Sequence, residues 1–169
     1  MPENWTTSRE SGIRFKYQFE KRVPFYKILT NGRKAMIQNK IVVHHQDGRL
    51  TKGITNDFFP DKDLFHLVPV NVAPGSKALE LRTTELKAVF FVKEFGGNPD
   101  YIDRKEFDPA KSVIGRKIKV VFKDGDLMVG TTLGYQPDRS GFFVVPADSQ
   151  SNIERCFVVT SATEEVSFI

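Results

Sequence analysis

The stretch KIVVHHQDGRL at residues 40–50 decides the fold, because the chain repeats it as KIKVVFKDGDL at residues 117–127. The offset of 77 positions continues without a gap, so that Gly53 meets Gly130 and Pro69 meets Pro146. A match at a fixed offset that keeps both turn residues and apolar positions indicates an internal duplication. We therefore interpret residues 39–92 as a first copy and residues 116–169 as a second copy of one unit.

Each copy has the pattern of a short β-meander. Apolar and polar residues alternate along the opening segment of both copies, which is typical of strands. Asp-Gly pairs follow and are predicted to form two-residue hairpin turns, because both residues tolerate positive φ. A glycine in the next strand predicts a bulge or a sharp bend. The residues assigned to these structural turns and bends are Asp47, Gly48, Gly53, Asp124, Gly125 and Gly130.

The predicted fold class is mainly β, with two tandem five-stranded SH3-like small barrels and little helix. Five short strands in each copy would leave bare edges in an open sheet, and closure into a small barrel removes them. Residues 93–115 are predicted to be a packed linker, held by the aromatic side chains of Phe95, Tyr101 and Phe107. Within the linker, residues 101–107 are expected to form a single helical turn.

Residues 1–38 form a basic N-terminal segment with one or two expected strands. The 15 Phe residues of the chain fall mostly in alternating runs, and residues 13–19 show this alternation clearly. The net charge of +4 comes from this segment, since the rest of the chain is slightly acidic. Cations neutralise phosphates and aromatic rings stack on bases, so the segment could bind a ligand or nucleic acid. Its candidate residues are Arg14, Lys16, Lys21, Arg22, Lys27 and Arg33.

Two family resemblances arise from the repeated pattern. The spacing from Val43 to Gly53, repeated from Val120 to Gly130, resembles the first motif of Sm proteins. This resemblance implies an Sm-like barrel, rings built through edge strands, and single-stranded RNA as a ligand. The Asp-Gly-x-x-x-x-Gly-x-Thr pattern with residues 86–92 and 96–101 is similar to a bacterial repeat domain. Such domains are often found beside PilZ or response-regulator modules, which implies a role in bacterial signalling.

The sequence has no catalytic signature, so we expect neither an enzyme nor a cofactor. His44 and His45 are neighbours on a predicted strand and point to opposite faces. His66 aligns with Phe143, and Cys156 aligns with Leu79, which favours packing roles for both. No metal-binding spacing such as Cys-x-x-Cys is present. The single cysteine and the lack of a signal segment predict a cytoplasmic protein that does not insert into a membrane.

The sequence thus predicts a non-catalytic regulatory or adaptor protein that acts on a protein partner in bacterial signalling or motility. An Sm-like single-stranded RNA-binding protein is the alternative. A weaker alternative is a cyclic-dinucleotide sensor that uses Arg14, Arg22 or Arg33. Oligomers could form through edge strands.

Overall fold

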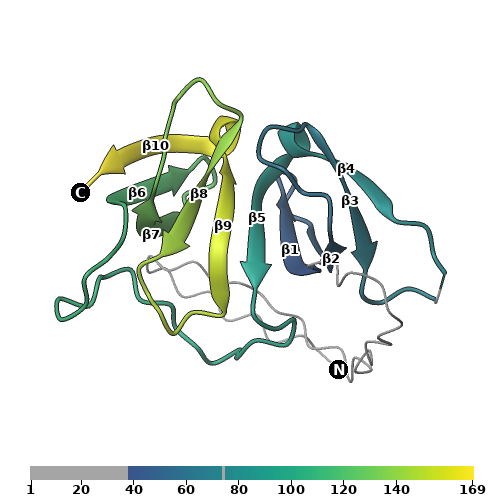
Figure 1. Cartoon of the computed structure of the whole chain (residues 1–169), viewed down its shortest axis with the longest axis horizontal. Coiled ribbons are helices and arrows are strands. Elements are labelled where there is room, and N and C mark those ends of the chain that lie inside the picture. The colour runs from purple at the N-terminus through teal and green to yellow at the C-terminus, as the bar shows by residue number, and fades with distance from the viewer. Residues whose placement is uncertain (1–37, 74) are drawn as a thin grey trace, which may run out of the picture.

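A computed structural model describes residues 38–73 and 75–169, which form one antiparallel sheet of ten strands and two single-turn 3-10 helices. The strand order is β10-β6-β7-β8-β9-β5-β1-β2-β3-β4 (Figure 1). The first copy contains β1 (Asn39–His45), β2 (Leu50–Thr55), β3 (Leu64–Pro69), β4 (Leu79–Arg82), η1 (Thr83–Glu85) and β5 (Leu86–Val92). The second contains β6 (Arg116–Phe122), β7 (Leu127–Thr132), β8 (Gly141–Pro146), β9 (Ile153–Val159), η2 (Thr160–Ala162) and β10 (Thr163–Phe168). A mainly β fold with little helix is therefore confirmed for the described residues.

The hairpin loops at the two Asp-Gly pairs have three residues and not the predicted two. The backbone amide of His45 donates to the carbonyl of Arg49 at 2.9 Å, and that of Gly48 donates to His45 at 3.1 Å. The second copy repeats this arrangement between Phe122 and Asp126. Gly48 and Gly125 take φ values of 88° and 87°. The loop is a β-turn followed by a left-handed glycine, a common three-residue hairpin connection.

Gly53 and Gly130 lie where two strands of each copy approach each other closely. A Cβ atom on Gly53 would lie 2.5 Å from the carbonyl oxygen of Val68, and one on Gly130 would lie 2.6 Å from a methyl carbon of Val144. Only two residue pairs join β2 to β3, and only two join β7 to β8. The glycines therefore allow the sheet to bend sharply at these crossings.

The prediction that each copy closes into its own barrel is not confirmed, because the sheet stays open. Both copies share one internal strand order, with the fifth strand beside the first and the fourth strand at the other end. The fourth and fifth strands of a copy are joined only through a single 3-10 turn. Closure was expected to remove bare edges, but β5 of the first copy instead pairs with β9 of the second.

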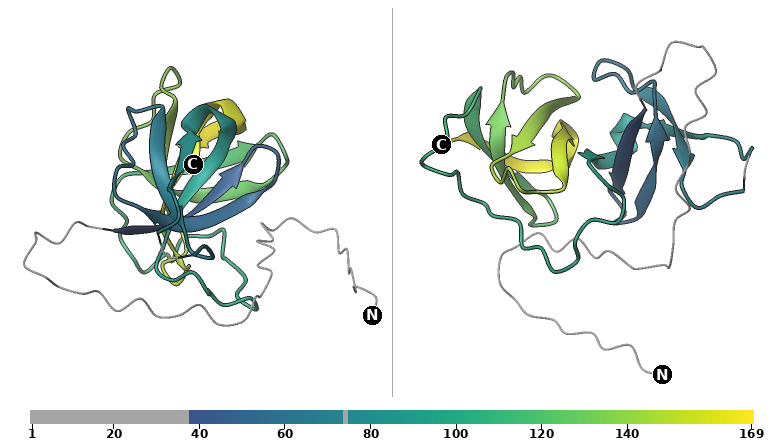
Figure 2. Two further views of the ribbon diagram at one scale, coloured as in Figure 1. Left: turned by 90° about the vertical axis from the view of Figure 1, so that its right-hand side faces the viewer. Right: turned by 60° about the horizontal axis from the view of Figure 1, so that its bottom comes forward.

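The β5–β9 pair, which we call the seam, joins the two copies into one sheet. Its antiparallel register sets Val89 opposite Phe157 and Phe90 opposite Cys156. Because successive strand residues point to opposite faces, each of the two strands contributes side chains to both copies. This explains why every residue of β5 is buried. The right-hand view of Figure 2 shows the two groups of strands lying side by side.

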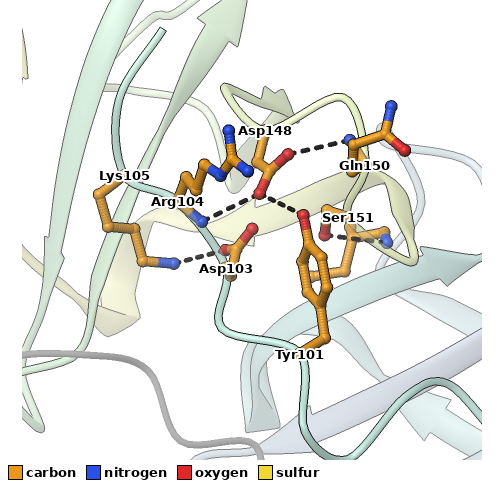
Figure 3. Close-up of polar contacts among 8 residues, drawn as sticks. Tyr101, Asp103, Arg104, Lys105, Asp148, Gln150 and Ser151 are labelled. Carbon is orange, nitrogen blue, oxygen red and sulfur yellow. Dashed lines mark hydrogen bonds and ion pairs between the residues drawn. The ribbon is translucent and has the colours of Figure 1, made fainter.

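The linker packs against the second copy without forming the predicted helical turn at 101–107. The Tyr101 hydroxyl donates to the carboxylate of Asp148 at 2.5 Å, and the Arg104 amide donates to the same carboxylate at 3.0 Å (Figure 3). The hydrogen bond to Asp148 raises the pKa of Tyr101 to about 12. Asp148 also caps the turn before β9 by accepting from the Gln150 amide at 2.9 Å. Bonds to the second copy thus replace the bonds a local helix would have made.

Candidate functional site

The six basic residues predicted to bind a ligand or nucleic acid lie outside the described residues. They are Arg14, Lys16, Lys21, Arg22, Lys27 and Arg33. The predicted turn and bend residues all lie in described loops and strands, and they shape the sheet as set out above. Within the described residues, the candidate sites are the seam and the two strands at the ends of the sheet, β10 and β4.

An aromatic cluster covers one face of the seam. Phe58, from the loop after β2, packs edge-to-face against Phe91 of β5 at 5.6 Å and Phe157 of β9 at 5.2 Å between ring centroids. Phe143 of β8 lies 5.8 Å from Phe91. The guanidinium of Arg155 lies 4.4 Å above the Phe91 ring. Side chains of the second copy therefore cover Phe58 and Phe91 of the first.

The second copy carries the counterpart of this surface at its own end, beside β10, where the guanidinium of Arg116 from β6 lies 3.5 Å above the Phe168 ring. By the offset of 77, Phe58 corresponds to Tyr135, and Phe91 corresponds to Phe168. These two rings pack against each other at 6.1 Å, and the side chain of Phe168 is 40% exposed. Neighbouring apolar residues are more exposed still: Ile114 at 84%, Leu133 at 86% and Ile169 at 61%.

We use the name open surface for five residues: Ile114, Leu133, Tyr135, Phe168 and Ile169. Its parts lie close together: a Cβ on Gly115 would be 3.4 Å from the Leu133 side chain, and the Ile169 amide donates to the carbonyl of Lys117 at 3.2 Å. Contiguous exposed apolar residues commonly mark interaction sites. Among the strands of residues 38–73 and 75–169, the adjacent β10 pairs with β6 alone, so none of them covers its other edge.

An ion cluster around the buried Lys87 crosses the seam near the start of β5. The Lys87 side chain is 5% exposed, and its ammonium donates to the carboxylate of Asp124 at 2.5 Å and to that of Asp126. The same ammonium lies 4.6 Å from the ring centroid of Phe122. Lys87 belongs to the first copy and its three partners belong to the second. The cluster therefore fixes how the two copies meet.

The ion cluster affects the protonation of its neighbours. Partial burial alone would raise the pKa of Asp124, but hydrogen bonds from Lys87 and from the Asp126 amide outweigh it, so the pKa lies below its ordinary value. Burial, with help from the Lys87 charge, lowers the pKa of His44. The Nδ1 atom of His44 is buried without a hydrogen-bond partner among the described residues. His44 is therefore held neutral and serves as a packing residue.

The other residues with reactive side chains are His45, His66 and Cys156, and each makes contacts that serve the fold. Nε2 of His45 lies 3.0 Å from the Thr51 hydroxyl, and Nδ1 of His66 lies 2.7 Å from the Asp57 carboxylate. Burial strongly raises the pKa of the Cys156 thiol, which is fully buried and thus poorly nucleophilic. Within the part of the chain that the structure describes, no group of three His, Cys, Asp or Glu residues could hold a metal ion. No described helix is long and apolar enough to cross a membrane.

The seam was missed by the sequence analysis, although a signal for it was present. Residues 88–92 are uniformly apolar, whereas the counterpart residues 165–169 include Glu165 and Ser167. A continuous apolar run is typical of a strand buried on both faces. The two copies therefore differ at the positions where one is covered and the other is exposed.

The fold and the site together define a duplicated β-sheet protein that has one internal seam and one exposed counterpart of it. The chain belongs to a family of unknown function, DUF6982, whose model matches residues 37–169. Neither a curated protein nor a solved structure matches it.

Proposed function

We propose that this chain is a non-catalytic adaptor that binds a protein partner in extended conformation along the open edge of β10. The observation that carries the proposal is the open surface: Phe58 and Phe91, the first-copy counterparts of Tyr135 and Phe168, pack against side chains of β8 and β9, whereas Phe168 is 40% exposed. Addition of a strand to an exposed sheet edge is a general mode of peptide recognition, in which backbone hydrogen bonds give affinity and side chains give specificity.

The finer parts of the proposal follow from the sequence. Each copy is an SH3-like, Sm-like unit, and the strand order 5-1-2-3-4 within each copy supports this relationship. The chain acts in the cytoplasm of a bacterium, in signalling or motility, as the resemblance to repeats found beside PilZ and response-regulator modules implies. The partner strand is expected to take, beside β10, the position that β9 takes beside β5, where Phe157 and Arg155 cover the first copy.

The test uses a fluorescently labelled peptide with the sequence of residues 151–160, in which Cys156 is replaced by Ser. We expect saturable binding to the full chain by fluorescence anisotropy. The Phe168→Lys variant should lose binding, because it places a charge on the open surface, while a matched Val145→Lys variant, also at an exposed strand position, should keep it. A control peptide with methylated alternate amides lacks the backbone donors and should not bind. Equal binding by both variants would refute the proposed site.

A further inference from the structure

We propose that the strand bound by the β10 edge is β4 of a second copy of this chain, so that chains associate head to tail. This inference rests on the proposed function, because it names the partner of the same site. The seam joins the fifth strand of one unit to the fourth strand of another. Within the described residues, the two strands left at the ends of the sheet are also a fourth strand, β4, and a fifth strand, β10.

The two open edges are therefore the two halves of the contact that the chain already makes inside itself. In Figure 1 they lie on different sides of the molecule, β10 in the left-hand group of strands and β4 in the right-hand group. A contact between two different surfaces is heterologous, and its repetition builds closed rings or open filaments. Each chain offers one edge of each kind and can thus bind two neighbours.

The seam also gives the register of the proposed contact. Adding 77 to each β5 residue and subtracting 77 from each β9 residue converts Phe90 opposite Cys156 into Ser167 opposite Leu79 of the next chain. In the same way, Val89 opposite Phe157 becomes Val166 opposite Glu80. Leu79 is 43% exposed, so the apolar face that would meet β10 is available.

The ion cluster of the seam has a charged counterpart at the open edges. In the seam, Lys87 of β5 reaches Asp126 in the loop of the next unit. At the open edges, the counterpart of Lys87 is Glu164, and the counterpart of Asp126 is Arg49. Both signs are reversed, so this pair stays attractive. The counterpart of Asp124, the second carboxylate that binds Lys87, is Asp47, which keeps its negative charge and pairs with Arg49 at 2.7 Å. Glu164 is exposed and the Arg49 side chain is 72% exposed, so both are accessible to a neighbouring chain.

The proposed contact is weaker than the seam. Glu80 replaces Phe157 and Glu165 replaces Ala88, so less apolar surface would be buried. Charged residues on edge strands also discourage indiscriminate pairing. The association is therefore expected to depend on protein concentration and on salt, because the Glu164–Arg49 pair is exposed and screened.

A charge-swap series tests the contact by sedimentation of the full chain over a range of concentrations. We expect an average mass above that of one chain. Arg49→Asp should weaken association about fivefold, because it leaves Glu164 facing two carboxylates, and the double variant with Glu164→Lys, which recreates the Lys–Asp pairs of the seam, should restore it. Both sites are exposed, so the folded state of each chain should be retained and can be checked by circular dichroism. Failure of the double variant to recover would overturn the proposed pairing.

Disulfide trapping tests the register separately. A Ser167→Cys chain mixed with a Leu79→Cys chain should form a linked pair under mild oxidation, because opposite strand residues meet disulfide geometry. A Glu80→Cys chain should not link, since its side chain lies on the other face. Equal linking by both chains would overturn the register. A strictly monomeric chain that still binds the β9 peptide would overturn self-association but retain the proposed function, whereas a monomer that binds no peptide would overturn both.

Discussion

Replacing both Asp124 and Asp126 by Asn should destabilise the protein far more than replacing Lys87 by Met. The Lys87 side chain is 5% exposed, whereas the side chains of Asp124 and Asp126 are 51% and 33% exposed. Removal of the carboxylates leaves a buried ammonium without a countercharge, with the Phe122 ring as its remaining close partner. Breaking a fully buried pair in this way costs about 3–5 kcal/mol, and an exposed pair costs at most about 1 kcal/mol.

The double Asn variant is expected to lose about 3 kcal/mol of its free energy of unfolding. This value lies between the two limits because only the cation is fully buried. The side chain of Asn at position 124 can still accept from the backbone amide of residue 126, as Asp124 does, so the hairpin loop is retained. Lys87→Met removes the charge and keeps a flexible side chain of similar length, so its cost should be below about 1 kcal/mol. The triple variant should recover about 2 kcal/mol relative to the double Asn variant.

Urea unfolding followed by circular dichroism measures these differences, and unchanged slopes would show that the comparison is sound. The pKa of Asp124 is lowered in the folded state, so its contribution is present above the pKa of the unfolded chain and is lost as pH falls through the lower folded value. The wild type should therefore lose stability below about pH 4 more steeply than Lys87→Met. If the double Asn variant were as stable as Lys87→Met, the cluster would not restrain the seam as argued.

Three further outcomes are expected. Gly130→Ala should cost about 2–3 kcal/mol in urea unfolding, because its Cβ would overlap the backbone carbonyl of Val145 and the side chain of Val144, whereas Gly134→Ala, with open space around it, should cost less than about 1 kcal/mol. Tyr101→Phe should cost about 1–2 kcal/mol and remove a phenol that titrates near pH 12 in an ultraviolet pH titration, and an unchanged titration curve would contradict the Asp148 bond. In the RNA-binding alternative, the affinity for single-stranded RNA should fall steeply with salt, and this dependence should be lost when the N-terminal basic residues are replaced by Ala. Salt-independent binding would contradict the electrostatic basis of that alternative. The residues to replace in that experiment are Arg14, Lys16, Lys21 and Arg22.

Local patterns predicted the strands well and their closure poorly. Alternation places Ile118, Val120 and Phe122 on one face, and all three are buried in β6. The Asp-Gly pairs predicted the loop positions, although the loops contain one more residue than expected. These features depend on neighbouring residues only. The partner of an edge strand depends on segments far apart in the chain, so the pairing of residues 86–92 with residues 153–159 could not be read from periodicity.

Positions at which the two copies differ indicate what each copy packs against, whereas positions at which they agree indicate what the shared fold requires. Where the repeat is faithful, as at Gly53 and Gly130, both copies need the same close approach of strands. Where the repeat diverges, one copy is covered and the other faces solvent. Lys87 is buried against two carboxylates, whereas its counterpart Glu164 is exposed at an open edge. Comparison of the copies therefore separates residues that maintain the unit from residues that determine its neighbours.

The two copies pair through a fifth strand of one and a fourth strand of the other, so an unpaired fourth strand and an unpaired fifth strand remain at the ends of the described sheet. An unprotected apolar edge invites aggregation, and a fully charged edge cannot bind a partner. This chain combines both characters: β10 carries Glu164 and Glu165, while Phe168 and Ile169 at its end remain apolar and exposed. Charge at one end of the strand restricts which strands can pair, and the apolar end supplies surface to bury. That combination favours a selective and reversible contact over permanent closure, which is the behaviour an adaptor requires.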